Sequence, residues 1–149
     1  MKHLHISCIV YLTSYFAAGD SLRSTPPFGN DVIINLSGVD LSFAELDGAH
    51  LEFANLDYAV LDYAHLFNAH LNGAHLKGAR LSGAGLNGAG LNGAVLVVAD
   101  MRDADLSDAD LNGADMGDAD LSGATVTKEQ LVQAKSLAGA IMPDGSKHP

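Results

Sequence analysis

The sequence predicts an all-β solenoid, because a five-residue unit recurs without insertion from Ile34 to Lys128. Leu is the central residue in sixteen of the nineteen units, and Met101, Met116 and Val126 replace it in the others. Ala stands two residues before the centre in every unit of the range 44–124. The remaining positions are rich in Gly, Asn, Asp and Ser, which suit tight turns.

A period of five is compatible with neither a straight helix nor a flat strand. On an α-helix five residues turn through about 500°, so successive Leu residues would drift by about 140° around the axis. On a strand an odd period would place successive Leu residues on opposite faces. Ala and Leu, two residues apart, share one face of a short extended segment, and the other three residues must turn the chain. The chain therefore winds as a coil with Ala and Leu inside, and each coil is stabilised by its neighbours.

This pattern closely resembles that of the pentapeptide-repeat family, Ala-(Asp/Asn)-Leu-X-X. The resemblance covers about two thirds of the chain, residues 34–128. It implies a right-handed quadrilateral parallel β-helix with four repeats in each coil. On that rule the repeats make nearly five coils, and a strand spacing of about 4.8 Å gives a rod about 23 Å long.

Residues 1–33 precede the repeats and are interpreted as a leader and a linker. No charged residue lies between Lys2 and Asp20, and Ala17-Ala18-Gly19 offers the small residues that a signal peptidase prefers. We therefore predict a cleaved signal peptide over residues 1–19 and export to the periplasm or the exterior; without cleavage the protein is cytoplasmic. A segment that caps the first coil, or a leader created by a misassigned start, are the alternatives.

Residues 129–149 are expected to form a capping helix, a final repeat-like strand and a tail. Thr127 and Gln130 fit a capping box, so a short helix should run to about Ser136. Gly139 is the expected stop of the helical segment, and Leu137, Ala140 and Met142 are spaced like centre, Ala and centre of the repeat. The helix should cover the open end of the core, as a repeat array requires. The alternative is an end-to-end homodimer, which the resemblance implies for some family members.

Composition excludes several classes of function. There are 18 acidic residues against 8 basic ones, for a net charge of −10, which argues against direct binding of nucleic acid and suits a basic partner. The single cysteine, Cys8, excludes an internal disulfide framework. No apolar run reaches the roughly 18 residues of a membrane-spanning helix. An interior filled by Leu leaves no room for a substrate, so we predict no catalytic residue and no cofactor.

Two outward histidines, His50 and His70, are expected one coil apart on the same side, with backbones about 4.8 Å apart. Neutral imidazoles in that arrangement could share a metal ion. Their column offers no third ligand, because Gly90 comes next. We therefore interpret them as exposed structural residues and predict no metal site.

Aromatic residues gather in the first two coils and should all project outward. They are Phe43, Phe53, Tyr58, Tyr63 and Phe67. An exposed apolar patch can mark a partner site. We favour instead a cover formed by residues 20–33, in which Phe28, Val32 and Ile33 supply the contacts.

Acidic residues dominate the last coils and define what we call the acidic belt. Its members are Asp100, Asp103, Asp105, Asp108, Asp110, Asp115, Asp118 and Asp120, and the only base in the same range is Arg102. Fourteen acids over the whole rod of about 23 Å give one per roughly 1.6 Å, close to about 1.7 Å for duplex DNA. The belt members should fall on all four sides of the rod.

The sequence thus predicts a non-enzymatic protein that presents a rigid acidic surface to an unidentified and basic protein partner. One alternative is a DNA mimic that binds DNA gyrase or another topoisomerase, a role that the resemblance implies. A passive structural element is the other alternative. Export would remove the topoisomerase partner, which acts in the cytoplasm.

Overall fold

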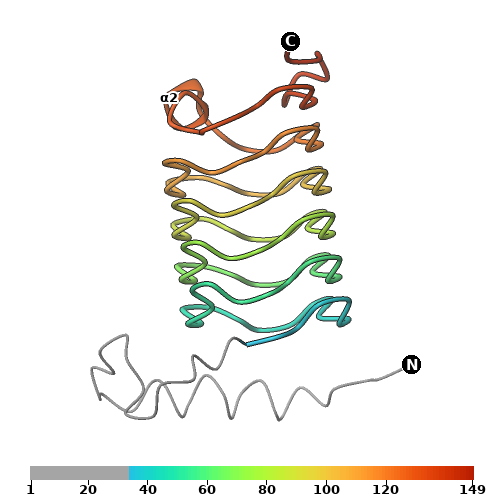
Figure 1. Ribbon diagram of the computed structural model, residues 1–149, viewed down its shortest axis with the longest axis vertical. Coiled ribbons are helices and arrows are strands. Elements are labelled where there is room, and N and C mark those ends of the chain that lie inside the picture. The colour runs from blue at the N-terminus through green and yellow to red at the C-terminus, as the bar shows by residue number, and fades with distance from the viewer. Residues whose placement is uncertain (1–33) are drawn as a thin grey trace.

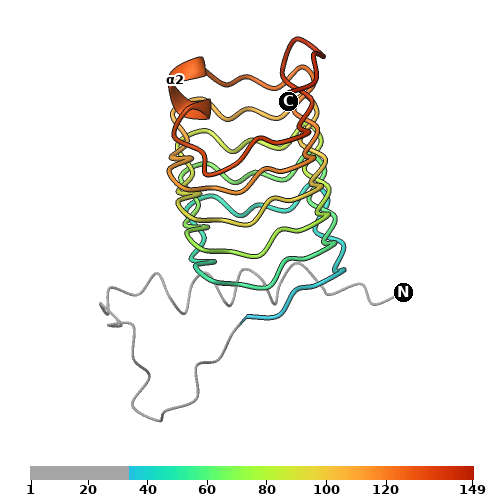
Figure 2. The same ribbon diagram turned by 45° about the horizontal axis from the view of Figure 1, so that its top comes forward.

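The computed structural model describes residues 34–149 as a stack of similar coils (Figure 1). Single-residue parallel bridges join the residue before each repeat centre to the residue 20 positions later, as in Asn35 with Asn55 and His50 with His70. Five-residue repeats and a 20-residue coil give four sides, each with its own column of bridges (Figure 2). The expected signal peptide 1–19 and the expected cover formed by residues 20–33 lie outside the described residues.

Each repeat ends in a tight turn that the backbone itself closes. The carbonyl of the central residue accepts the N–H three residues later, as Leu41 does from Ala44 at 3.0 Å. The residue two positions after the centre has a positive φ, 59° at Phe43 and 64° at Gly48, as in a type II turn. Glycine meets this requirement at nine of the eighteen corners between Gly38 and Gly123, and Asn or Asp tolerates it at four others.

The interior is made of the Ala and Leu columns. Every Ala or Leu at these two positions between Leu36 and Ala124 is at most 8% exposed, so the predicted inward placement is confirmed. Leu56, Leu76 and Leu96 are stacked one coil apart and fully buried. Burial of each such Leu contributes about 1.5–3 kcal/mol, and this contribution recurs at every side of every coil.

In the repeats of residues 54–103, backbone hydrogen bonds use four of the five N–H groups and leave out that of the residue after the centre. In residues 54–58, the amides of Asn55, Leu56 and Tyr58 donate to carbonyls of adjacent coils, and that of Ala54 closes a turn. The amide of Asp57 donates to the Oδ1 of Asn55 at 3.1 Å instead. A polar residue before a centre, such as Asn55, is therefore part of the fold as well as part of the surface.

The repeats end at the helix α2, Lys128–Leu131, which begins with the expected capping box between Thr127 and Gln130. The helix is shorter than the sequence predicts, because it ends at Leu131 and not near Ser136. The chain must rejoin the stack at that point: Ser136 pairs with Asp115, and Ile141 pairs with Asp120. Both pairs are 21 residues apart, so the helical segment adds one residue to the coil. Among residues 34–149, no helix has the length and apolar character needed to cross a bilayer.

Polar groups at this end of the stack are satisfied by α2 and the tail. The Nε2 of Gln130 donates to the carbonyls of Leu106 at 2.7 Å and Ala109 at 2.9 Å. In a regular coil the Ala carbonyl accepts a backbone N–H of the next coil, as that of Ala89 does from Asp110. The tail folds back so that Lys147 pairs antiparallel with Ile141. An uncovered strand edge invites pairing with other chains, so this end has the features of a cap.

Candidate interaction surface

Aspartates of the acidic belt occupy two positions of the repeat, and one of these positions closes a local turn. The Oδ1 atoms of Asp105 and Asp120 accept the N–H two residues later, from Ser107 and Ser122, each at 2.9 Å. Asp110 does the same for Asn112 at 3.0 Å. Asx-type bonds of this kind make Asp and Asn favourable before each centre whatever the partner.

The other position is the corner with positive φ. Asp103, Asp108 and Asp118 have φ of 57°, 57° and 54° and are exposed. The Asp103 side chain lies over Gly123 in the next coil, where an added Cβ would come within 2.2 Å of the Asp103 Oδ1. Corner Asp and the Gly that follows one coil later are therefore a packed pair.

The belt surrounds the rod and does not form a single patch. The column and repeat positions place Asp100, Asp103 and Asp120 on one side, Asp105 and Asp108 on the next, Asp110 on the third, and Asp115 and Asp118 on the fourth. The structure brings these eight residues into neighbouring coils, as expected from their spacing.

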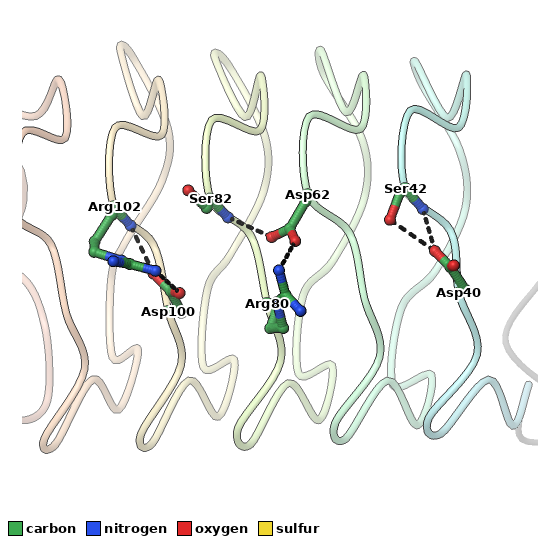
Figure 3. Close-up of polar contacts among 7 residues, drawn as sticks. All are labelled: Asp40, Ser42, Asp62, Arg80, Ser82, Asp100 and Arg102. Carbon is green, nitrogen blue, oxygen red and sulfur yellow. Dashed lines mark hydrogen bonds and ion pairs between the residues drawn. The ribbon is translucent and has the colours of Figure 1, made fainter.

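One side of the rod offsets its negative charge with both arginines of the repeat region (Figure 3). Arg102 forms two bonds to Asp100, Nε to Oδ1 at 2.8 Å and an Nη to Oδ2 at 2.7 Å. Arg80 pairs with Asp62, the most buried acid among residues 34–149. The Arg102 side chain holds the pKa of Asp100 below its usual value, and the same pair raises the pKa of Arg102.

Among the described residues, most members of the belt form no ion pair with a lysine or arginine. Lys135 lies 3.3 Å from Asp115. Within residues 34–149 no ion pair with a lysine or arginine involves the other six belt members, which are Asp103, Asp105, Asp108, Asp110, Asp118 and Asp120. The Ser107 side chain and backbone N–H lower the pKa of Asp105.

The first coils carry a different surface. Phe43 and Tyr63 stack with ring centroids 5.3 Å apart and planes 11° apart, and both rings are exposed. Phe67 joins them in lining a shallow pocket with polar residues of the same coils, including Asp47 and His65. The outward projection of the aromatic residues is as predicted.

The two histidines also stack, and the structure adds a neighbour that the sequence reasoning missed. The rings of His50 and His70 lie 4.4 Å apart at 11°. The Glu52 carboxylate reaches the Nδ1 atoms of both rings. A search for a third ligand along the column of His50 and His70 does not reach Glu52, because Glu52 occupies a different position of the same repeat. The signal in the sequence is the spacing His50-x-Glu52.

Comparisons with known proteins agree with this geometry. The family model for pentapeptide repeats matches residues 34–73, 59–96 and 99–135 with eight copies of the repeat. The chain therefore belongs to the pentapeptide-repeat family, whose members form right-handed quadrilateral β-helices. Comparison with curated proteins gave no significant match.

Solved structures of the same family are similar to the chain. The pentapeptide-repeat protein alr5209 from Nostoc PCC 7120 is 28% identical with a TM-score of 0.62, over 85% of this chain and 93% of that one. HetL from Nostoc sp. strain PCC 7120, described as involved in heterocyst differentiation regulation, is 32% identical with a TM-score of 0.42, over 77% and 70%. Rfr23 from the cyanobacterium Cyanothece 51142 is 30% identical with a TM-score of 0.49, over 59% of this chain and 56% of that one.

Proposed function

We propose that the protein is a non-enzymatic scaffold whose acidic belt binds a basic protein. The observation that carries the proposal is the set of six belt aspartates without an ion pair to lysine or arginine among residues 34–149. They are held on a backbone in which every coil is bonded to its neighbours, so their charges keep fixed positions. Fixed charges of one sign steer an oppositely charged partner and select against acidic ones.

The belt can be tested with two triple variants that remove the same charge. The first changes Asp103, Asp108 and Asp118 to Asn, which tolerates the left-handed corner equally well. The second changes Asp40, Asp47 and Asp57 to Asn in the first coils. Basic proteins retained from the source cell at low salt are purified, and their affinity for the parent and both variants is measured across a salt series.

We expect the belt variant to lose at least about tenfold in affinity and to show a shallower salt dependence. The first-coil variant should bind like the parent at every salt concentration. Equal losses in both variants would mean that only net charge matters. No loss in either would place the binding surface elsewhere. Either result contradicts the proposal.

DNA mimicry is the second candidate, favoured by the linear density of acids along the rod. The arginine side, where Arg80 and Arg102 pair with Asp62 and Asp100, interrupts the negative surface that a DNA surrogate requires. A rod of about 23 Å also matches only about seven base pairs of duplex at roughly 3.4 Å each. Mimicry would therefore require the end-to-end homodimer through residues 128–142.

Two measurements separate mimicry from the favoured function. We expect no inhibition of gyrase supercoiling by the parent at stoichiometric amounts. Inhibition that disappears in the belt variant would support mimicry and overturn the favoured function. The mass in solution is the second readout, since a strictly monomeric protein is too short to mimic the DNA that a topoisomerase holds. If the protein is a passive structural element, neither the parent nor either variant should bind a partner.

A further inference from the structure

We propose that His50, Glu52 and His70 form a binding site for one divalent transition-metal ion of the zinc class. The three side chains come from two adjacent coils on one side of the rod. Two imidazoles and one carboxylate are a ligand set that zinc accepts in proteins, with a fourth position left to water. This site is independent of the acidic belt and of the function proposed for it.

The distances suit a tetrahedral ion. The Glu52 Oε1 lies 3.1 Å from the His50 Nδ1 and 3.7 Å from the His70 Nδ1. Ligand bonds of about 2.0–2.1 Å in a tetrahedral zinc site place the ligand atoms about 3.4 Å apart. The two observed distances lie on either side of that value. One ligand atom from each residue lies within 4.8 Å of the other two. An imidazole binds a metal ion along the lone pair in its ring plane, so the two nearly parallel rings must turn toward each other to complete the site.

The backbone places the two imidazoles side by side before any ion binds. His50 and His70 are directly bridged, and their rings are stacked at 4.4 Å. Their side chains are 47% and 48% exposed and that of Glu52 is 35% exposed, which leaves one side open to solvent. An ion held by both coils binds only the folded stack and therefore stabilises it by mass action.

A second cluster on the adjacent side provides an internal comparison. Glu45, Asp47 and His65 occupy the same repeat positions in the same two coils. This cluster has only one imidazole. The Oδ1 of Asp47 is already engaged, because it accepts the N–H of Phe67 at 2.8 Å. Carboxylate-rich sets favour harder ions than zinc. The His50–Glu52–His70 cluster is therefore the better site for zinc.

Titration of the untagged full-length chain with Zn²⁺, followed by calorimetry, tests the proposal. The parent should bind one ion at this site, and affinity should fall on acidification because protons compete for the imidazoles. His70→Ala should lower the affinity at least about tenfold, and Glu52→Gln, which keeps the side-chain shape, should lower it as well. His75→Ala is the matched control, since His75 is bridged only to Asn55 and Val95.

Several results would overturn the proposal. One is equal binding of Zn²⁺ by the parent, His70→Ala and Glu52→Gln. That result would place the ion elsewhere, for instance at His3, His5 or Cys8 of the leader. The loss could follow His65→Ala and spare His70→Ala, which would assign the ion to the second cluster. Thermal unfolding gives a second readout: Zn²⁺ should raise the melting temperature of the parent and of His75→Ala, and should leave that of His70→Ala unchanged.

Discussion

The first two coils and the last two share one backbone and carry unrelated surfaces. In the first coils the corners hold rings such as Phe53 and Tyr63, and in the last they hold Asp103 and Asp118. Both halves have the same bridges, the same turn bonds and the same buried Ala and Leu columns. The comparison teaches that the inward columns define the coil, while the outward positions are free to carry a function.

The corners show how different surfaces fit one backbone. A Cβ on Gly73 would lie 2.5 Å from the ring of Phe53, and one on Gly83 would lie 2.4 Å from the ring of Tyr63. In the last coils Gly123 has the same relation to the Asp103 carboxylate. In both halves a corner side chain leans over the glycine of the next coil, so the packing rule is shared although the chemistry differs.

The largest expected effect comes from breaking the column that both halves share. Leu76 is fully buried between Leu56 and Leu96, and Leu76→Ala should cost about 2–5 kcal/mol in the free energy of unfolding. Asn72→Ser is the outward control. It weakens one bond between coils, from the Asn92 N–H to the Asn72 Oδ1, and should cost about 1 kcal/mol or less. Denaturant unfolding measures both, and equal costs would contradict the inward placement of Leu.

The Ala column should resist enlargement. Ala79 is fully buried beside the Leu column, so Ala79→Leu should be destabilising by about 1–3 kcal/mol through overpacking. Thermal and denaturant unfolding check this value. A neutral substitution would mean that the column has room for larger residues, and the division between inward and outward positions would fail.

A corner substitution should stabilise the protein. Val98 has φ of 60°, a conformation that is costly for a β-branched residue, and its side chain is exposed. Val98→Gly should raise the free energy of unfolding by about 1 kcal/mol, because the relief of strain exceeds the entropy lost by glycine. Val97→Gly, at the preceding position, which has no positive φ, should destabilise instead. Stabilisation by both substitutions would remove strain as the explanation.

The smallest expected effect is a loss of folding stability at acid pH, which involves the last coils and the tail. Ser107 lowers the pKa of Asp105 from 3.8, and Ser146 lowers the pKa of Asp144. Lowered pKa values favour the ionised form in the folded state. Their stabilising contribution is therefore present above about pH 4 and is lost as the pH falls through the folded values. Ser107→Ala should reduce this acid sensitivity in melting experiments between pH 2 and 6, and an unchanged profile would contradict it.

The periodic part of the fold could be predicted from the sequence because each repeat contains its own inward residues. Ala and Leu two residues apart define the face, and Gly, Asn or Asp define the corner. The end of α2 could not be predicted, because Leu131 is the last helical residue for a tertiary reason: Lys135 must reach the carbonyl of Ala114.

For both surfaces, the positions of the residues could be predicted from the sequence, whereas the contacts between side chains could not. Belt residues could be placed from their spacing alone, since each occupies a regular repeat position. Ion pairs between coils could not, as with Arg80 and Asp62 or with Lys135 and the belt residue Asp115. Glu52 was missed beside His50 and His70 for a similar reason: contacts between different positions of the repeat depend on side-chain direction as well as on the 20-residue period.

Residue-resolved amide hydrogen exchange tests most directly whether one backbone underlies both surfaces. Within the regular coils, the residue after each centre is the position whose N–H makes no backbone hydrogen bond, and at Ser42, Ser107 and Ser122 it donates to an Asp side chain instead. In every repeat of residues 54–103 the other four amides donate to backbone carbonyls. The account predicts slow exchange interrupted by one fast amide in every five, with the same phase in the aromatic half and in the acidic half. A period-five pattern confined to one half, or a uniform profile along the repeats, would contradict it.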